Sequence, residues 1–313
     1  ATPMRDDGSI DYDCYQKLID WQVSEGADAI VSMGTSGESP TVSFEEHTAV
    51  VKAAVEAAAG RVPVIAGTGA NSTAEAIRLT REALEVGAQY SLQVVPYYNK
   101  PPQEGMYQHF KTIADAVELP IILYNIPGRC VVNMEAETTL RLANDCENVI
   151  AVKEASGKMD QIATIAAAAP EGFSVYSGDD SATYDIMRLG GVGVISTTGN
   201  VAPERMKELV TKCAEGKWDE AWAAHEALLP LMNGLFETSN PILVKEALKL
   251  VGFPVGGVRL PLVDATPEQS ARLASIMREV GVLDYNRPPL KMRRRPDALG
   301  SAFLRVTTFR KRH

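Results

Sequence analysis

The chain has few of the residues that mark several common protein classes. Its 313 residues include only four cysteines and four histidines, and no two cysteines form a C-x-x-C pair. Scattered cysteines indicate reduced thiols rather than a disulfide framework or a zinc site. No apolar run approaches the roughly 20 residues that a membrane-spanning helix needs, and no signal peptide is visible. We therefore expect a cytoplasmic globular protein with no metal and no membrane contact.

Positive charge is scarce in most of the chain and concentrated at its end. The formal net charge is −9, and eight of the 31 basic residues but only one of the 40 acidic residues follow Leu290. Residues 1–290 therefore carry −16 and the tail carries +7. An acidic body argues against a nucleic-acid surface, which needs clustered Lys and Arg. We expect residues 284–313 to be a disordered or foreign basic tail, and a nucleic-acid-binding arm is the less favoured alternative.

Short apolar runs rich in β-branched residues alternate with amphipathic stretches. Most runs are apolar on both faces, as buried parallel strands are. The expected strands span 29–33, 62–66, 90–95, 121–125, 149–153, 173–177 and 193–197. Helices are expected at 12–25, 74–86, 104–117, 135–143, 158–169 and 181–189, and a capping box at Ser43 and Glu46 opens another. This alternation predicts a parallel sheet with right-handed crossovers.

Two architectures fit this alternation, an open doubly wound sheet and an eight-stranded barrel. Only seven strands are visible, and the helix expected at 12–25 follows the first residue almost at once. We infer that a first strand lay just upstream and is truncated here. With that strand, residues 1–215 form a (β/α)8 TIM barrel. Further helices expected at 218–231, 241–251 and 267–280 form a C-terminal helical region over 216–283.

The candidate chemistry lies where the strands end, because a barrel of this type carries its active site at the carboxyl ends of its strands. Lys153 closes an apolar strand. Desolvation would lower the pKa of its amine and favour the neutral nucleophile that a Schiff base requires. The alternative is a lysine whose amine simply reaches solvent at a strand end.

Other strand ends carry groups that suit a carboxylate substrate. Thr35 and Ser36 lie in a hydroxyl-rich turn that either binds an anion or only caps a helix. Arg129 is either a bidentate carboxylate clamp or an ordinary surface arginine. Tyr97 and Tyr98 are either packing residues or proton carriers. The residues alone leave these alternatives open.

Taken in order, the strand-end motifs resemble the dihydrodipicolinate synthase family. This family belongs to the pyruvate-dependent class I aldolases, which include N-acetylneuraminate lyase. The resemblance covers about residues 1–283. The motifs are GTSGES (34–39), GTGAN (67–71), PYYN (96–99), YNIPGR (124–129), VKEASG (152–157), SGDD (177–180) and GVIS (193–196).

The resemblance implies a reaction and roles for particular residues. Pyruvate and L-aspartate 4-semialdehyde would condense to 4-hydroxy-tetrahydrodipicolinate, the first committed step of lysine (diaminopimelate) biosynthesis. Lys153 would form the Schiff base with pyruvate, and no other cofactor is implied. Tyr124, Thr35 and Tyr98 would relay protons, with Tyr98 supplied by a neighbouring subunit. Arg129 would hold the carboxylate of the semialdehyde.

The resemblance also implies a pyruvate pocket, an inhibitor site and an assembly. Three residues would line the pocket: Ser36, where Thr is more usual in the family, Gly178 and Ile195. L-lysine would inhibit the enzyme by binding at a dimer interface to Ser39, His47, Asn71, Glu75 and Tyr97. Phe44 departs from a His found in some lysine-sensitive relatives, so the strength of inhibition stays open. The family is commonly a dimer of dimers, and plant or algal members would lie in the plastid stroma.

Two other functions are alternatives. Another aldolase of the superfamily, such as a sialic acid lyase or a 2-keto-3-deoxy sugar acid aldolase, is disfavoured by Arg129 together with Tyr97 and Tyr98. A non-catalytic barrel would have lost its nucleophile, whereas Lys153 is present.

Overall fold

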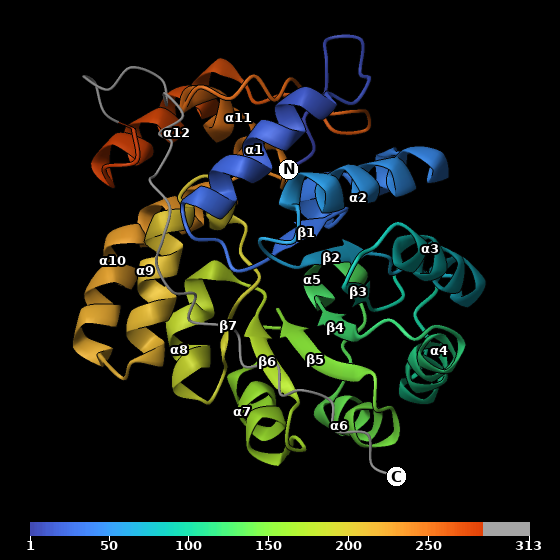
Figure 1. Ribbon diagram of the computed structural model, residues 1–313. Helices are drawn as coiled ribbons and strands as arrows, with labels where there is room; N and C mark the ends of the chain where they lie inside the picture. Colours follow the sequence, from blue (N-terminus) through green and yellow to red (C-terminus); the bar gives the residue numbers. More distant parts are fainter. Residues whose placement is uncertain (284–313) are drawn as a thin grey trace.

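A single parallel sheet organises the computed structural model, which describes residues 1–283. Its seven strands are hydrogen-bonded in chain order, each to the next, and they curve into a barrel-like arc with helices outside (Figure 1). The strands are β1 (Ile30–Ser32), β2 (Val64–Gly67), β3 (Tyr90–Val94), β4 (Ile121–Asn125), β5 (Val149–Glu154), β6 (Ser174–Ser177) and β7 (Gly193–Val194). The predicted parallel barrel-type sheet is confirmed.

Alternating side chains give the sheet two apolar faces. On β4, Ile121 and Leu123 pack outward with the helices, whereas Ile122 and Tyr124 point into the arc. The inner cluster also includes Leu92 of β3 and Ala151 of β5. Because side chains alternate along a strand, both faces can be apolar only if both are buried.

The last strand is shorter than predicted. The sequence predicts a strand over 193–197, but β7 ends at Val194. The backbone N–H groups of Thr197 and Thr198 instead donate to the Asp180 carboxylate, at 3.0 and 2.7 Å. These bonds turn the chain into a short 3-10 helix, η4 (Thr198–Asn200), and so end the strand.

The sheet ends at β1 and β7, and within residues 1–283 no strand joins these two edges. The first two residues lie between the ends of β1 and β7. The Thr2 hydroxyl donates to the Gly37 carbonyl beyond β1, at 2.8 Å. The amine of Ala1 donates to the Asn200 side chain beyond β7, at 2.6 Å. The first strand expected upstream of Ala1 stays a prediction.

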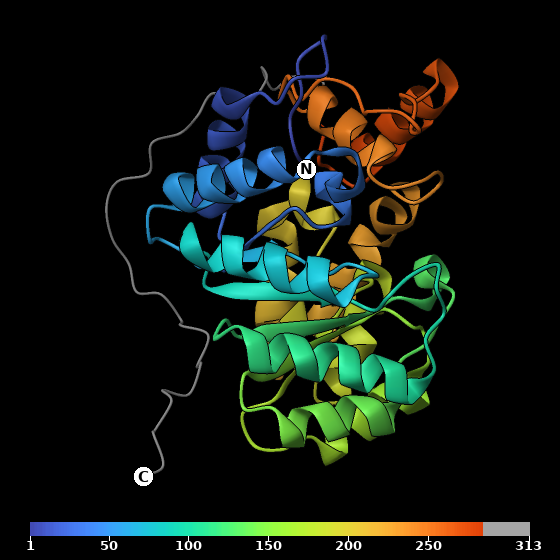
Figure 2. The same ribbon diagram turned by 90° about the vertical axis from the view of Figure 1, so that its right-hand side faces the viewer.

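Nine helices of the described chain flank the strands. They are α1 (Tyr12–Ser24), α2 (Phe44–Ala58), α3 (Thr73–Glu85), α4 (Gln103–Ala116), α5 (Pro127–Cys130), α6 (Ala136–Asp145), α7 (Met159–Ala168), α8 (Thr183–Arg188) and α9 (Pro203–Ala214). The predicted capping box at Ser43 and Glu46 is present at the start of α2. Figure 2 shows α2, α3, α4 and α6 side by side on the outer face of the sheet. None of the described helices is long and apolar enough to cross a membrane.

Three more helices complete the described chain: α10 (Trp218–Gly234), α11 (Ile242–Leu250) and α12 (Pro267–Glu279). Their buried leucines, among them Leu228 and Leu248, share one core with Leu18 of α1 and Leu209 of α9. Helix α10 runs a turn further than predicted. Its last residue, Gly234, lies so close to Ile276 of α12 that a Cβ would come within 2.8 Å of the Ile276 side chain. The division between barrel and helical region at 215/216 stays a prediction, and the basic tail over 284–313 lies outside the described residues.

Candidate active site

Lys153 and Tyr124 lie next to each other at the carboxyl ends of β5 and β4. The strand register pairs Tyr124 with Lys153, and Lys153 with Tyr176 of β6. The Lys153 Nζ atom lies 4.2 Å from the centre of the Tyr124 ring. Only 9% of Lys153 and 6% of Tyr124 are exposed. A nearly buried amine next to a phenol suits imine formation with proton transfer.

The apolar interior of the arc lies beneath this pair. Ala151 and Ile122 each precede a member of the pair by two residues and so point to the same side of the sheet. Gly178, at the end of β6, makes room for the lysine. A Cβ there would lie 3.1 Å from Lys153 Cγ and 2.7 Å from Ala155 Cβ. A side chain at 178 would therefore clash with Ala155 and press on the Lys153 side chain.

A buried hydrogen-bond network fixes the residues that follow Tyr124 and Lys153. Asn125 and Glu154 are both fully buried. Asn125 Nδ2 donates to both carboxylate oxygens of Glu154, at 3.1 and 3.2 Å. The Gln161 amide and the Ser156 backbone N–H also donate to this carboxylate, at 3.0 and 2.9 Å. The ends of β4 and β5 are therefore tied together directly beside the amine and the phenol.

Asn125 and Glu154 were not among the predicted site residues. Their signal was a polar residue directly after each candidate catalytic residue, at the end of an otherwise apolar strand. Polar side chains at such buried positions need hydrogen-bond partners. The partners Gln161 and Asn133 come from separate loops and helices, so the sequence does not identify them.

The turn after β1 holds Thr35 and Ser36 in the 3-10 helix η1 (Thr35–Gly37). Since all strands are parallel, this turn and Lys153 lie at the same end of the sheet. Asn240, which precedes α11, donates from Nδ2 to the Ser36 hydroxyl at 3.0 Å. At the end of β7, Ile195 is half-buried and its N–H donates to the Ser177 carbonyl.

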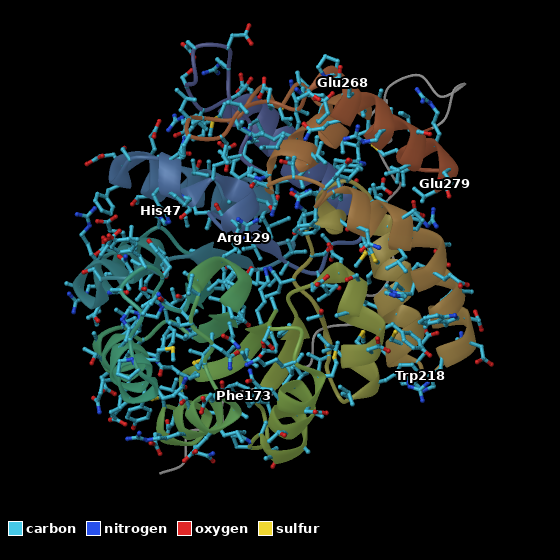
Figure 3. The ribbon with its side chains drawn as sticks, turned by 180° about the vertical axis from the view of Figure 1, so that it is seen from behind. His47, Arg129, Phe173, Trp218, Glu268 and Glu279 are labelled. Atoms are coloured by element: carbon cyan, nitrogen blue, oxygen red, sulfur yellow. The ribbon has the colours of Figure 1, made fainter. Side chains whose placement is uncertain are left out.

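Two other predicted site residues are exposed. The Tyr98 residue is 88% exposed and has a positive φ of 74°. Arg129 is also exposed and lies on the short helix α5, near the centre of the view in Figure 3. Neither side chain is packed into the interior of its own chain, so both are free to meet a substrate or a second subunit.

Most residues of the predicted lysine site lie in one neighbourhood. Asn71 Nδ2 donates to the Tyr97 carbonyl at 3.1 Å, and burial, together with the nearby charge of Glu75, raises the pKa of the Tyr97 phenol. His47 is buried on α2 (Figure 3) and its Nε2 lies 2.8 Å from the Gly67 carbonyl. Burial lowers the pKa of His47, which favours the neutral ring with Nε2 as donor.

Ser39 and Phe44 lie on the segment that runs from the turn beyond β1 to the first residue of α2. Ser39 begins the 3-10 helix η2 (Ser39–Thr41) on the turn beyond β1. Phe44, the departure from the family pattern, is partly exposed and stacks under the Arg78 guanidinium at 3.7 Å. A cation and the face of an aromatic ring attract each other. The Arg78 guanidinium therefore already occupies one face of the Phe44 ring.

No group of three or more His, Cys, Asp or Glu residues within the described part of the chain is placed to hold a metal ion. All four cysteines are free thiols and buried. The functional groups at the strand ends include an amine, phenols, hydroxyls and a guanidinium. These groups suit carbonyl chemistry on a carboxylate substrate.

Known proteins share both this sequence and this fold. The model of the dihydrodipicolinate synthetase family matches residues 1–280. A relative from Azoarcus sp., 4-hydroxy-tetrahydrodipicolinate synthase, is 50% identical over 282 residues, which cover 90% of this chain and 96% of the relative. The crystal structure of dihydrodipicolinate synthase from Aquifex aeolicus has a TM-score of 0.88 and 47% identity, covering 91% of this chain and 97% of that one. A further structure, from Cyanidioschyzon merolae with lysine bound, has a TM-score of 0.89 and 42% identity and covers 90% of this chain and 96% of that one.

Proposed function

The chain belongs to the dihydrodipicolinate synthetase family, and on that premise we propose that it condenses pyruvate with L-aspartate 4-semialdehyde to give 4-hydroxy-tetrahydrodipicolinate. It is a lyase of the class I aldolase type. Enzymes of this family form a Schiff base between pyruvate and a lysine and need no external cofactor. The observation that carries the proposal is the nearly buried Lys153 amine, 4.2 Å from the centre of the Tyr124 ring.

The proposed reaction begins at the Lys153 amine. In its neutral form the amine adds to the C2 carbonyl of pyruvate, and water leaves as the imine forms. The imine makes the methyl group acidic, and loss of a proton gives an enamine. The enamine carbon attacks the aldehyde of the semialdehyde. The amino group of that substrate then displaces Lys153 by transimination, which closes the ring and frees the enzyme.

Proton transfers in these steps are assigned to three hydroxyl groups. Tyr124 lies beside the amine, and Thr35 lies on the turn at the same end of the sheet. Tyr98 is proposed to enter from a neighbouring subunit, which is supported by its exposure within a single chain. The proposed assembly is therefore a homo-oligomer, a dimer or a dimer of dimers. Positioned proton donors and acceptors contribute about 10²–10⁴-fold to such reactions.

The proposed substrate contacts divide between two carboxylates. Ser36, Gly178 and Ile195 are assigned to the pyruvate side, and the Gly178 position beside Lys153 supports this assignment. Arg129 is assigned to the carboxylate of the semialdehyde, since a guanidinium binds a carboxylate through two parallel hydrogen bonds.

We also propose that L-lysine binds and inhibits this enzyme. The proposed contacts are those predicted from the sequence: Ser39, His47, Asn71, Glu75 and Tyr97. Two observations support the site. Three of these residues share a neighbourhood in the chain, and the relative from Cyanidioschyzon merolae was solved with lysine bound.

Cytoplasmic location is likewise a proposal. The four free buried thiols are compatible with a reducing compartment.

A turnover assay with alternative aldehydes tests the function. The wild-type chain is supplied with pyruvate and either L-aspartate semialdehyde or N-acetylmannosamine. We expect turnover of the semialdehyde only and none in Lys153→Ala, while the exposed neighbour Lys158→Ala stays active. Turnover of the sugar alone, or full activity in Lys153→Ala, would contradict the proposal.

A further inference from the structure

A buried ion pair joins the hydroxyl turn after β1 to the C-terminal helices. Lys245 of α11 and Glu38 lie 2.6 Å apart, Nζ to Oε1, and their side chains are only 2% and 1% exposed. The chain separation is more than 200 residues. An ion pair withdrawn from water at this depth is not needed for stability alone, since apolar residues of similar volume often serve as well. A specific geometric purpose is the better explanation.

The backbone at Glu38 shows what the pair holds in place. Glu38 has φ 60° and ψ 34°, the left-handed conformation that side chains disfavour. It joins η1, which carries Thr35 and Ser36, to η2. The contacts of the Glu38 side chain therefore hold the turn in a conformation that the backbone alone does not prefer.

Both members of the pair have further partners on the segment after α11. The other carboxylate oxygen of Glu38 accepts from the Arg259 backbone N–H at 3.0 Å. Lys245 Nζ donates to the Gly257 carbonyl at 2.6 Å. The Glu38 carboxylate and the Lys245 amine are thus each held by a backbone hydrogen bond as well as by the ion pair.

A second contact from the same region reaches the turn itself. Asn240, two residues before α11, is 5% exposed and donates to the Ser36 hydroxyl at 3.0 Å. The Arg259 side chain also binds the Thr41 carbonyl and Glu46, on the far side of the turn. The turn over 35–41 is therefore held from both ends by residues 240–259.

We propose that Glu38 and Lys245 are positioning residues whose buried ion pair sets the conformation of the turn and so aims the Thr35 and Ser36 hydroxyls at the substrate on Lys153. The inference rests on the proposed function, because it assigns the turn to that reaction. Neither residue is proposed to touch the reacting atoms. The C-terminal helices thereby contribute to catalysis without supplying a catalytic group.

The test compares Glu38→Gln, Lys245→Met and their combination. Each variant is measured for melting temperature, for kcat and KM with pyruvate, and for the pyruvate adduct that borohydride traps on Lys153. Lys245→Met leaves a buried carboxylate unpaired, so we expect a lower melting temperature and at least a tenfold lower kcat. The double variant removes both charges and should regain much of the lost melting temperature. Its kcat should stay at least tenfold below wild type, while the adduct still forms.

Lys249→Met is the matched control, because Lys249 lies one turn further along α11 and pairs with Glu246 at a more exposed site. It should change neither kcat nor melting temperature. A double variant whose kcat returns with its melting temperature would overturn the positioning role. If the double variant does not fold, Glu38→Gln decides, because it keeps size and shape: a wild-type kcat there would overturn the role. Absence of an adduct in the wild-type chain would overturn the proposed function as well, whereas a wild-type adduct with unimpaired variants overturns the positioning role alone.

Discussion

The floor and the rim of the candidate site differ in how firmly the chain fixes them. The floor, made of Lys153, Tyr124, Asn125 and Glu154, is buried and tied together by hydrogen bonds within the chain. The rim, made of Tyr98 and Arg129, is exposed. We propose from this difference that one chain prepares the group that captures pyruvate, and that the second substrate and a neighbouring subunit complete the site. Four predictions test this division, and the largest expected effect comes first.

Removing the hydroxyl group of Tyr124 should impair the floor directly. In Tyr124→Phe the ring still packs over the Lys153 amine, so the melting temperature should not change. We expect kcat to fall by about 100-fold or more, because a positioned proton carrier contributes about 10²–10⁴-fold. The matched control is Tyr176→Phe, since Tyr176 is paired with Lys153 from the other side and burial raises its pKa to about 12. A kcat within twofold of wild type in Tyr124→Phe would remove the phenol from the mechanism.

Changing Arg129 should affect the rim and leave the floor intact. In Arg129→Ala we expect KM for the semialdehyde to rise about tenfold or more, because a charge-assisted hydrogen bond contributes about 1.5–3 kcal/mol. The KM for pyruvate and the melting temperature should not change. Lys158→Ala, an exposed cation beyond β5, is the control and should behave as wild type. An equal rise in both KM values would mean that floor and rim are not separate.

Breaking the hydrogen-bond network within the floor should lower the free energy of unfolding more than a change at an exposed residue. Asn125→Ala removes a donor from the buried Glu154 carboxylate. A buried group left without its partner costs about 1–3 kcal/mol, so the free energy of unfolding measured in urea should fall by about that amount. Asn144→Ala removes an exposed hydrogen bond on α6, from the Asn144 side chain to the Leu140 carbonyl, and should change the free energy of unfolding little. An equal loss of unfolding free energy in the two variants would contradict the view that the floor is fixed more firmly than the exposed surface.

His47 gives the smallest effect and tests a buried residue of α2 that belongs to neither the floor nor the rim. Its pKa lies below the ordinary value of 6.5 because of burial, so below that pH the unfolded chain binds more protons than the folded chain. The stability that neutral His47 contributes is present above pH 6.5 and is lost as the pH falls. We expect His47→Gln, which retains a donor for the Gly67 carbonyl, to lose less unfolding free energy than wild type from about pH 7 to about pH 5. An equal loss of unfolding free energy in His47→Gln and wild type would show that His47 does not cause the pH dependence.

Local features of the fold were largely predictable from the sequence. Strand β4 has the predicted bounds, because an apolar run is enclosed by Pro120 and Pro127. The capping box at Ser43 is an equally local signal. Strand β7 was too long in the prediction because the Asp180 carboxylate, well before it in the chain, turns its end aside.

The residue types of the site were predictable, but the buried contacts that hold these residues in place were not. Lys153 stood out as a lysine that closes an apolar strand, and its closeness to Tyr124 follows from two adjacent strands. The roles of Tyr98 and Arg129 came from resemblance and stay predictions. The Glu38–Lys245 pair has no local signal, since its members are distant in the chain and meet only when the C-terminal helices pack against the turn.

Borohydride trapping with pyruvate alone tests the central claim most directly, because it involves only the floor. The wild-type chain is treated with pyruvate and borohydride and its peptides are mapped by mass spectrometry. We expect one reduced pyruvate adduct, on the peptide that contains Lys153, and none in Lys153→Ala. An adduct on another lysine, or an equal adduct in Lys153→Ala, would contradict the account.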